Sequence, residues 1–448
     1  MRPLLLLLSA AALLAQPSVD LSHGPLRVSE NKRAFVHADG TPFFYLGDTA
    51  WELFHRLNRE EAERYLEDRR ARRFTVIQAV ALAELDGLNT PNPYGNKPLH
   101  DNDPARPNDA YFQHVDWIVK RAAEKGLIIG LLPSWGRYVR QGSWEKESAA
   151  IFTESSAYAY GQWIAARYAD APNLIWILGG DRTPEGVVPI WRAMARGIRE
   201  ADTGRHLITF HPQGRQSSSQ LLHNEDWLDF NMFQSGHNQR DKRNDEMTDY
   251  DYSRLPVKPV LDGEPRYENH PIDWRPKENG FFDGFDVRQA AWWSVLAGAA
   301  GHTYGCHDIW QMLAPGREPV GFARGSWQAS LALPGADQMR HLRALIEAHD
   351  PLTRAPAQHL LASGAQQAGS PIRVALGKGY LLAYTPFGEA IQLLSVPELG
   401  RTVRASWFDP RTGLSRPIGP RPNAPRRWLP PGKLGRGQDW VLVLEAAR

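Results

Sequence analysis

Cysteine is almost absent from this chain, since Cys306 is the single one in 448 residues. One cysteine cannot form an intrachain disulfide, so no disulfide framework is expected. Long apolar runs are scarce as well. Beyond the N-terminus no run approaches the roughly 18 apolar residues of a membrane-spanning helix, so the mature protein is expected to cross no membrane.

An excess of charge of either sign is also missing. The formal net charge is +2, and Lys and Arg are spread along the chain, which argues against nucleic acid and acidic membrane surfaces as partners. Apolar residues make up 42% and charged residues 23%, which excludes a disordered or collagen-like chain. The length suits one large domain and a smaller one.

The sequence lacks the short motifs of several hydrolase classes. G-x-S-x-G and H-E-x-x-H do not occur, and no H-x-H follows the first predicted strand. His302 and His307 stand five residues apart, a weak spacing for metal ligands, and Cys306 has only His307 nearby to activate it. We therefore expect no metal and no cofactor, and keep a metal hydrolase as the first rival hypothesis.

The N-terminus has the pattern of an export signal. One positive charge at Arg2 precedes a run from Leu4 to Ala15 that is apolar except for Ser9, and Gln16-Pro17 ends it. Such a run of twelve residues is too short for a bilayer but typical of a signal-peptide core. We predict a signal peptide over residues 1–16 and an exported protein without a lipid anchor.

Strand and helix patterns then alternate eight times. The predicted strands are Phe43–Leu46, Thr75–Leu82, Leu127–Leu132, Leu174–Leu178, His206–Phe210, Leu228–Phe233, Lys258–Leu261 and His302–Tyr304. This pattern predicts a (β/α)₈ TIM barrel. An open doubly wound sheet is the alternative, but it needs a Gly-rich turn after the first strand, and G-D-T-A-W is not one.

Flanking segments complete the predicted architecture. Leu26–Phe44 indicates a small antiparallel lid, and a helix over Gly335–Ala348 closes the barrel. Short strands separated by Gly, Pro and Asn turns follow, which indicates a small antiparallel β-sandwich. The predicted strands of this domain are Ile372–Leu376, Tyr380–Thr385, Ile391–Leu394, Thr402–Phe408 and Trp440–Leu444. We predict a catalytic domain over residues 25–352 and a C-terminal domain over residues 356–448, which we expect to brace the barrel.

Two acidic residues follow predicted barrel strands. N-L-I-W-I-L-G-G-D ends in Asp181 after the fourth strand, and P-V-L-D-G-E-P carries Glu264 after the seventh. The carboxyl ends of barrel strands carry the chemistry, and two carboxyls placed there are typical of a glycoside hydrolase. We predict that Asp181 is the general acid/base and Glu264, with Arg266 nearby, the nucleophile.

Structural roles for the two acids are the alternative. Asp181 could cap a helix, but Thr183-Pro184-Glu185 is the better cap sequence. A buried ion pair with Arg182 or Arg266 stays open. A separation near ~5–5.5 Å between the two carboxyls would indicate retention of configuration, and ~6.5–9.5 Å inversion.

Polar or aromatic residues follow all eight predicted strands. Such side chains suit sugar hydroxyl groups and ring faces. The predicted substrate-binding residues are Asp48, Trp51, Gln78, Trp135, His211, Gln234, His237, Tyr304, His307 and Trp310.

Together these segments resemble a known family. G-D-T-A-W, V-I-Q, G-G-D, H-P, Q-S-G-H, D-G-E-P and G-H-T-Y-G followed by I-W-Q are similar to the apiosidase-like glycoside hydrolases, family 140, joined to a C-terminal "putative collagen-binding" β-domain. The likeness spans about residues 25 to 445. The G-G-D differs from the N-E that most related hydrolases carry after the fourth strand, and Cys306 stands where a polar residue is expected.

The resemblance implies a (β/α)₈ hydrolase that releases apiose-linked side chains from the pectin rhamnogalacturonan II. Its two catalytic carboxylates match Asp181 and Glu264. We expect a monomer that acts on a plant-type polysaccharide or oligosaccharide, with retention of configuration. Another glycosidase, such as an arabinofuranosidase, or a non-catalytic polysaccharide- or collagen-binding protein on a barrel scaffold, is the alternative.

Overall fold

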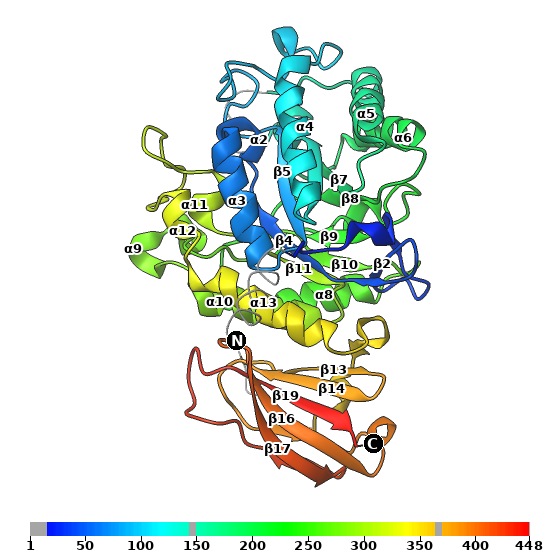
Figure 1. The fold of residues 1–448 in the computed structure, drawn as a ribbon, viewed down its shortest axis with the longest axis vertical. Helices are drawn as coiled ribbons and strands as arrows, with labels where there is room; N and C mark the ends of the chain where they lie inside the picture. The colour runs from blue at the N-terminus through cyan, green and yellow to red at the C-terminus, as the bar shows by residue number, and fades with distance from the viewer. Residues whose placement is uncertain (1–15, 143–148, 363–369, 448) are drawn as a thin grey trace, which may run out of the picture.

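The computed structural model describes residues 16–142, 149–362 and 370–447. A barrel of parallel strands surrounded by helices forms the larger part, and a domain of antiparallel strands lies beneath it (Figure 1). The predicted fold class, a (β/α)₈ barrel followed by an antiparallel β-domain, is confirmed. The predicted signal peptide, apart from Gln16, lies outside the described residues.

Eight parallel strands form the barrel. They are β4 (Tyr45–Thr49), β5 (Val76–Leu82), β6 (Ile128–Ser134), β7 (Leu174–Gly179), β8 (Ile208–His211), β9 (Asn231–Phe233), β10 (Val260–Asp262) and β11 (Gly301–Tyr304). Every residue in them is buried, as expected for strands enclosed between a core and a ring of helices.

Hydrogen bonds close the strands into a ring. Six strands pair in the order β11-β4-β5-β6-β7-β8, and β9 pairs with β10. The hydroxyl of Thr209 donates to the Phe230 carbonyl at 2.7 Å, which joins β8 to the start of β9. On the other side, the Ala300 amide donates to the Val260 carbonyl at 2.9 Å and joins β10 to the start of β11. The carboxyl ends of all eight strands therefore face one mouth.

Helices follow each strand around the ring. They are α2 (Leu53–Arg56), α3 (Arg59–Ala71), α4 (Asp109–Glu124), α5 (Glu154–Tyr168), α6 (Val188–Ala201), α7 (Ser219–Leu222), α8 (Asn244–Tyr252), α9 (Pro276–Asn279), α10 (Gly284–Leu296), α11 (His307–Trp310), α12 (Trp327–Ser330) and α13 (Pro334–Glu347). Helix α8 lies within an acidic, polar segment over residues 241–254. Helix α10 begins at Gly284 because Asp283 forms a capping box with Asp286. None of the helices in the described ranges is long and apolar enough to span a membrane.

The predicted N-terminal lid is a three-stranded antiparallel sheet at the end of the barrel away from the mouth. It contains β1 (Leu26–Val28), β2 (Phe35–His37) and β3 (Pro42–Phe43). The ring of Phe35 packs edge-on against Phe230, with 4.9 Å between centroids. Because Phe230 precedes β9, this sheet covers the amino ends of the strands and does not cover the site.

The second domain is built on a six-stranded antiparallel sheet. Its order is β12 (Ala355–Pro356), β13 (Arg373–Gly377), β14 (Tyr380–Thr385), β19 (Trp440–Ala446), β16 (Thr402–Asp409) and β17 (Leu414–Pro422), and β15 (Ile391–Leu393) pairs with β18 (Arg426–Trp428). Three of these strands, β12, β17 and β18, are absent from the prediction. Prolines 417, 420 and 422 obscure β17, which the sheet tolerates because β17 is an edge strand.

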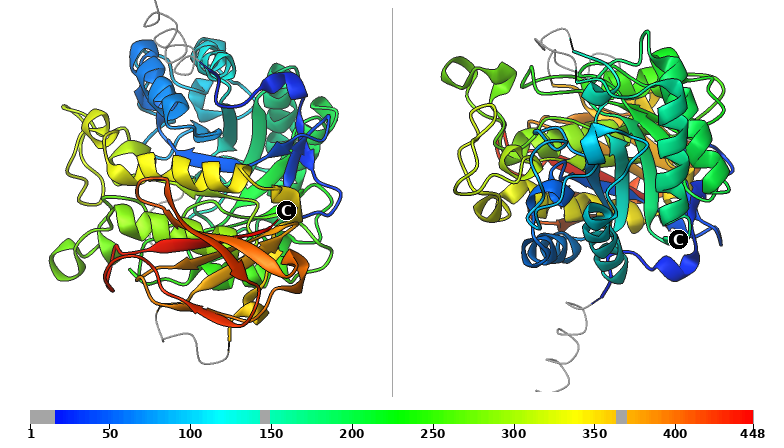
Figure 2. Two further views of the ribbon diagram at one scale, coloured as in Figure 1. Left: turned by 60° about the horizontal axis from the view of Figure 1, so that its bottom comes forward. Right: turned by 90° about the horizontal axis from the view of Figure 1, so that it is seen from above.

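Helices α10 and α13 lie between the barrel and the sheet (Figure 2). The ring of Trp292 on α10 stacks on Tyr384 of β14, with 5.9 Å between centroids. Arg288 forms a buried ion pair with Asp439 at 2.6 Å. Both charges are buried, so moving the domains apart would leave each charge without its partner. The pair therefore holds the two domains in one arrangement, which agrees with the expectation that the C-terminal domain braces the barrel.

Candidate active site

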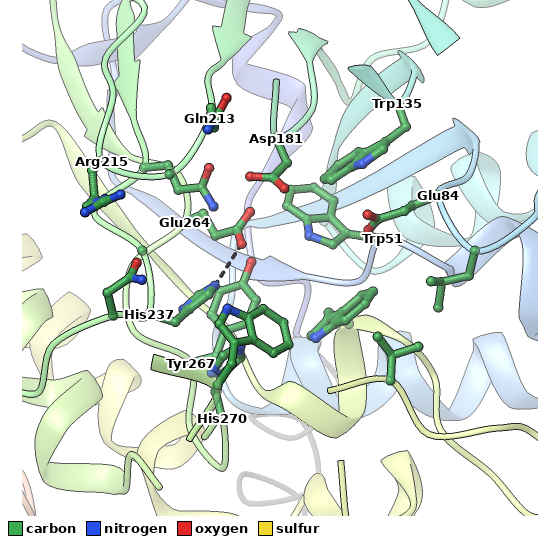
Figure 3. Close-up of a pocket in the computed structure, with 18 residues that line it drawn as sticks. Trp51, Glu84, Trp135, Asp181, Gln213, Arg215, His237, Glu264, Tyr267 and His270 are labelled. Carbon is green, nitrogen blue, oxygen red and sulfur yellow. Dashed lines mark hydrogen bonds and ion pairs between the residues drawn. The ribbon is translucent and has the colours of Figure 1, made fainter. Parts of the chain in front are cut away.

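A cleft of about 600 Å³ opens at the mouth of the barrel. Asp181 and Glu264 both line it, and their carboxyl groups face each other (Figure 3). Residues that are 83 positions apart in the sequence therefore meet at one site because β7 and β10 deliver them from the same end of the ring.

Two glycines place Asp181. Gly179 and Gly180 have φ angles of 89° and 115°, which L side chains rarely adopt. A Cβ on Gly180 would lie 2.6 Å from the Trp135 ring, which is too close. The backbone can pass this near to the ring only because residue 180 is glycine. Asp181 itself has a φ of 51°, a left-handed conformation that short polar residues tolerate. The G-G-D segment thus turns sharply and leaves the Asp181 side chain 31% exposed in the cleft.

Glu264 follows β10 through another close turn. The Gly263 amide donates to the Phe233 carbonyl at 2.8 Å. The amide group of Gln78, from the opposite side of the ring, donates to the Gly263 carbonyl at 3.0 Å. A Cβ on Gly263 would lie 2.5 Å from the Met232 sulfur, so a larger residue here would have to displace the Met232 side chain. The backbone before Glu264 is therefore held from both sides.

Two imidazoles hold the Glu264 carboxylate. His237 Nε2 donates to Oε1 at 2.9 Å, and His211 Nε2 lies 3.1 Å from Oε2. The Asp181 amide donates to His211 Nδ1 at 3.3 Å, so the His211 proton sits on Nε2 and faces Glu264. The ring of Trp51 packs edge-on against His211 at 5.4 Å between centroids and fixes its orientation.

The two acids have opposite protonation preferences. Burial raises the pKa of Asp181 to about 6, and the negative charge of Glu264 adds to the rise, whereas Arg182 and His211 oppose it. Burial also acts against ionisation of Glu264, but the contacts of His211 and His237 with its two oxygens outweigh it and lower the pKa to about 2. One carboxyl that keeps its proton beside one that loses it is the combination that acid-assisted glycoside cleavage needs.

The alternative ion pairs are only partly present. Arg182 Nη1 donates to an Asp181 carboxylate oxygen at 3.3 Å and to the Asp181 carbonyl at 2.8 Å. Arg266 does not pair with Glu264: it donates to Gln289 at 3.0 Å and lies 5.6 Å from the Trp293 ring. The alternative of an ion pair between Glu264 and Arg266 is therefore wrong, and the two histidines contact Glu264 instead.

The predicted cap at Thr183-Pro184-Glu185 is also wrong. Helix α6 begins at Val188, with Pro189 in its first turn and no side-chain cap at Val187. The Thr183 segment instead forms a turn in which the Val187 amide donates to the Pro184 carbonyl at 3.0 Å. Asp181 is nevertheless not a helix cap.

Five of the ten predicted substrate-binding residues line the cleft, and His211 contacts Glu264 beside it. The five are Trp51, Trp135, Gln234, His237 and Trp310. The indole nitrogen of Trp135 is buried and has no hydrogen-bond partner within the described residues.

The other four predicted residues do not line the cleft. Asp48 points to the helix layer and pairs with Arg69 at 2.6 Å. Gln78 lies inside the barrel, where it holds Gly263. The hydroxyl of Tyr304 donates to Glu268 at 2.7 Å, and His307 accepts from the Trp310 indole at 3.1 Å. These four side chains belong to the strands or to the layer of residues packed against the strands. They contact residues near the mouth and do not reach the cleft.

Several cleft residues lie outside the predicted set. The polar and aromatic ones are Glu84, Gln213, Arg215, Asn238, Tyr267, His270 and Trp274. Most of them come from loops beyond the strand ends, where no spacing rule applies. Within the described part of the chain, no group of three His, Cys, Asp or Glu side chains is placed to hold a metal ion.

Glu84 gives the cleft a third carboxyl. It follows β5 and lies on the Trp51 and Trp135 side of the cleft (Figure 3). Burial raises its pKa to about 8, and the charge of Asp181 contributes to the rise. At neutral pH Glu84 is therefore protonated, and it can both donate and accept a hydrogen bond.

Sequence comparison identifies the family. The model of the family described as "Apiosidase-like, catalytic domain" matches residues 29–353. The chain belongs to the apiosidase-like glycoside hydrolases. A second model, described as "Putative collagen-binding domain of a collagenase", matches residues 355–445 of this hydrolase. The search of curated proteins found no match.

Solved structures agree with the family. The hydrolase is similar to a protein described as a glycoside hydrolase, at 33% identity and a TM-score of 0.90, over 96% of this chain and 99% of the other. A glycoside hydrolase family 5 protein from Bacteroides vulgatus ATCC 8482 is 33% identical, with a TM-score of 0.89, over 96% of this chain and 94% of the other. A family 5 mannosidase from Rhizomucor miehei, 12% identical with a TM-score of 0.52 over 73% of this chain and 98% of its own, shares the fold. The expectation of a glycosyl hydrolase is confirmed.

The pKa of Asp181 predicts an alkaline limit to activity. A general acid must hold its proton, so kcat/KM of the free enzyme should fall as pH rises through about 6. Arg182 lowers the pKa of Asp181, so Arg182→Gln should move this midpoint to higher pH, and Arg192→Gln, far from the cleft, should not. The measurement is kcat/KM for an aryl glycoside from about pH 4 to about pH 9. A midpoint that stays in place or moves down in Arg182→Gln contradicts this assignment.

Glu84 predicts a separable effect on KM. Glu84→Gln keeps a neutral side chain with a donor and an acceptor, so KM at pH 7 should stay within about threefold of wild type. Glu84→Ala should raise KM about tenfold, the cost of about one substrate hydrogen bond. Wild-type KM should rise above about pH 8 as Glu84 ionises, whereas KM of Glu84→Gln should not. Equal KM values for the three proteins would show that Glu84 does not contact the substrate.

Proposed function

We propose that this hydrolase releases apiose-linked side chains from pectin, of the rhamnogalacturonan II type, with retention of configuration. The observation that carries the proposal is the match of residues 29–353 to the apiosidase-like catalytic domain, because this segment contains both acids and the whole cleft. The opposite pKa shifts of Asp181 and Glu264 support the two-step mechanism.

In the first step Glu264 attacks the anomeric carbon and forms a glycosyl ester, while Asp181 gives its proton to the departing glycosidic oxygen. In the second step Asp181 takes a proton from water, whose oxygen then displaces Glu264 from the sugar. The histidines 211 and 237 keep Glu264 ionised and fix its two oxygens. This mechanism consumes water alone and requires no cofactor.

The cleft walls suit a sugar. Trp51, Trp135, Trp274 and Trp310 offer ring faces and edges for the apolar side of the ring. The amide group of Gln234 hydrogen-bonds Asp181 and can reach the same sugar. We infer that these residues, with Glu84, form the subsite of the released sugar.

We further propose that the enzyme is exported and acts as a monomer. The apolar run Leu4–Ala15 behind Arg2 supports export. A pectin polymer is too large to enter a cell intact, so an enzyme that acts on its side chains works outside the cytoplasm. The two acids and both histidines that contact Glu264 come from the same barrel, so the proposed mechanism needs no residue from a second copy.

Variants at the two acids test the mechanism. Glu264→Ala should lower kcat by about 10⁴-fold or more with every leaving group, because no ester can form. Asp181→Ala should lower kcat about 10²- to 10⁴-fold with poor leaving groups, which need a proton to depart. With a dinitrophenyl leaving group, which needs no proton, the rate of the first step should fall much less. Azide should restore the activity of Asp181→Ala and give a glycosyl azide with retained configuration. Both melting transitions should stay near wild type. Wild-type kcat in Glu264→Ala, or wild-type kcat with poor leaving groups in Asp181→Ala, would contradict the assignment.

Substrate comparison tests the sugar. We expect hydrolysis of an aryl apioside and of apiose-bearing rhamnogalacturonan II fragments, at a kcat/KM at least about 10²-fold above that for aryl arabinofuranosides. NMR of the first product should show the anomer of the substrate. Preference for the arabinofuranoside would identify the other glycosidase, and the absence of hydrolysis in every case would support a carbohydrate-binding role.

A further inference from the structure

Positive charge is concentrated in one stretch of the second domain. From Arg411 to Gln438 the chain carries seven Lys and Arg side chains and no Asp or Glu, although the whole protein has a net charge of +2. The expectation of evenly spread basic residues is wrong for this stretch. Like charges at this density repel each other and lower stability unless opposite charges offset them. We therefore ask which of these side chains pair with carboxylates of the protein and which do not.

Some of these charges have protein partners. Arg411 pairs with Asp409 at 2.7 Å, and Arg436 pairs with Asp283 of the barrel domain at 2.7 Å. These two brace β16 and the contact between the domains. They belong to the architecture, and a ligand has no access to their paired faces.

Four arginines remain without a carboxylate partner among the described residues. They are Arg416 and Arg421 on β17 and Arg426 and Arg427 on β18, and they line one groove of about 580 Å³. No acidic side chain contributes to its wall. Strand β17, which lines the groove, lies on the part of the domain that is farthest from the barrel (Figure 1), and the groove shares no lining residue with the catalytic cleft.

Aromatic rings orient two of the four guanidinium groups. Arg416 lies 5.0 Å from the centroid of the Trp440 ring, and Arg426 lies 5.4 Å from that of Trp428. A cation over a ring face keeps its charge and its N–H groups available at the edge. Arg427 is exposed. The groove therefore presents fixed, forked donors, which match the two oxygens of a carboxylate.

Strand β17 excludes one class of partner. Its prolines 417, 420 and 422 lack the N–H groups that a further strand would need. Edge-to-edge pairing with a second copy of this domain is therefore blocked. The tryptophans of the groove, Trp407 and Trp428, are only 3% and 6% exposed, so no aromatic face is open to stack on a nucleic acid base or a neutral sugar.

We propose that this groove binds an anionic polysaccharide whose charges are carboxylates, a polyuronate, through Arg416, Arg421, Arg426 and Arg427. The choice of a polysaccharide rests on the proposed function, whereas the choice of an anionic ligand rests on the four unpaired charges. Binding at this groove holds the enzyme on a polymer while the cleft, on another face, acts on a side chain.

Affinity electrophoresis through gels that contain unesterified polygalacturonate tests the proposal. The protein is the full-length Asp181→Ala variant, so that catalysis does not alter the polymer. We expect retardation that disappears in about 0.5 M NaCl, because screening weakens exposed charge pairs. Fully methyl-esterified polygalacturonate, which lacks the charge, should retard the protein at least about tenfold less.

Two sets of substitutions locate the binding. Changing the four groove arginines together to Gln should raise the apparent Kd for polygalacturonate about tenfold or more. The matched control changes Arg106, Arg192, Arg205 and Arg340 on the barrel domain to Gln, which removes the same charge and should leave the Kd within about twofold. The single exposed change Arg427→Glu should raise the Kd at least about threefold and cannot disturb packing, so it decides the matter if the fourfold variant misfolds.

The outcomes separate this proposal from the proposed function. With Asp181 restored, the fourfold variant should hydrolyse a small aryl glycoside at the wild-type rate, which shows that the groove and the cleft act independently. Equal binding of wild type and the fourfold variant would overturn the proposal, as would stronger binding to heparin, single-stranded DNA or collagen than to polygalacturonate. A failure of the apioside test with polygalacturonate binding intact would overturn the proposed function alone.

Discussion

The contact of two imidazoles with the Glu264 carboxylate is the interaction on which the rest of the site depends. Burial alone would protonate this acid, and a protonated Glu264 is no nucleophile. His237 at 2.9 Å and His211 at 3.1 Å reverse that preference. The negative charge that they stabilise then helps to keep the proton on Asp181. The two histidines thereby determine that Glu264 is ionised and favour a protonated Asp181. For this, each histidine has to lie within hydrogen-bond distance of one Glu264 carboxylate oxygen.

The barrel supplies that precision by bracing the backbone before each acid. Gln78 holds Gly263 from across the ring, and the close approach of Gly180 to Trp135 fixes the turn that ends in Asp181. Buried strands on rigid neighbours keep such contacts better than loops do. The second domain adds to this rigidity through the buried Arg288–Asp439 pair on α10, the helix between β10 and β11. The turns before Asp181 and Glu264 are therefore the backbone segments through which the fold positions the two acids.

Sequence patterns predicted the barrel, its eight strands and the position of the two acids at its mouth, because buried strands and strand-end glycines leave local signals. They failed where a side chain's direction decides its role. Asp48 and Gln78 sit in strands next to the mouth, yet one points to the helices and the other into the barrel. Glu84, Arg215 and His270 were missed because loop residues reach the cleft through tertiary packing. The proline-rich strand β17 was missed because an edge position overrides the low strand propensity of proline.

The claim that Glu264 is the ionised nucleophile can be tested directly by trapping the glycosyl-enzyme. A 2-fluoro glycoside with a dinitrophenyl leaving group forms the ester readily but releases it slowly, so digestion and mass spectrometry locate the bound sugar. The account predicts one sugar per enzyme, attached to the peptide that contains Glu264, and none in Glu264→Gln. A sugar attached to Asp181 or Glu84, or turnover to an inverted product without any adduct, would contradict it.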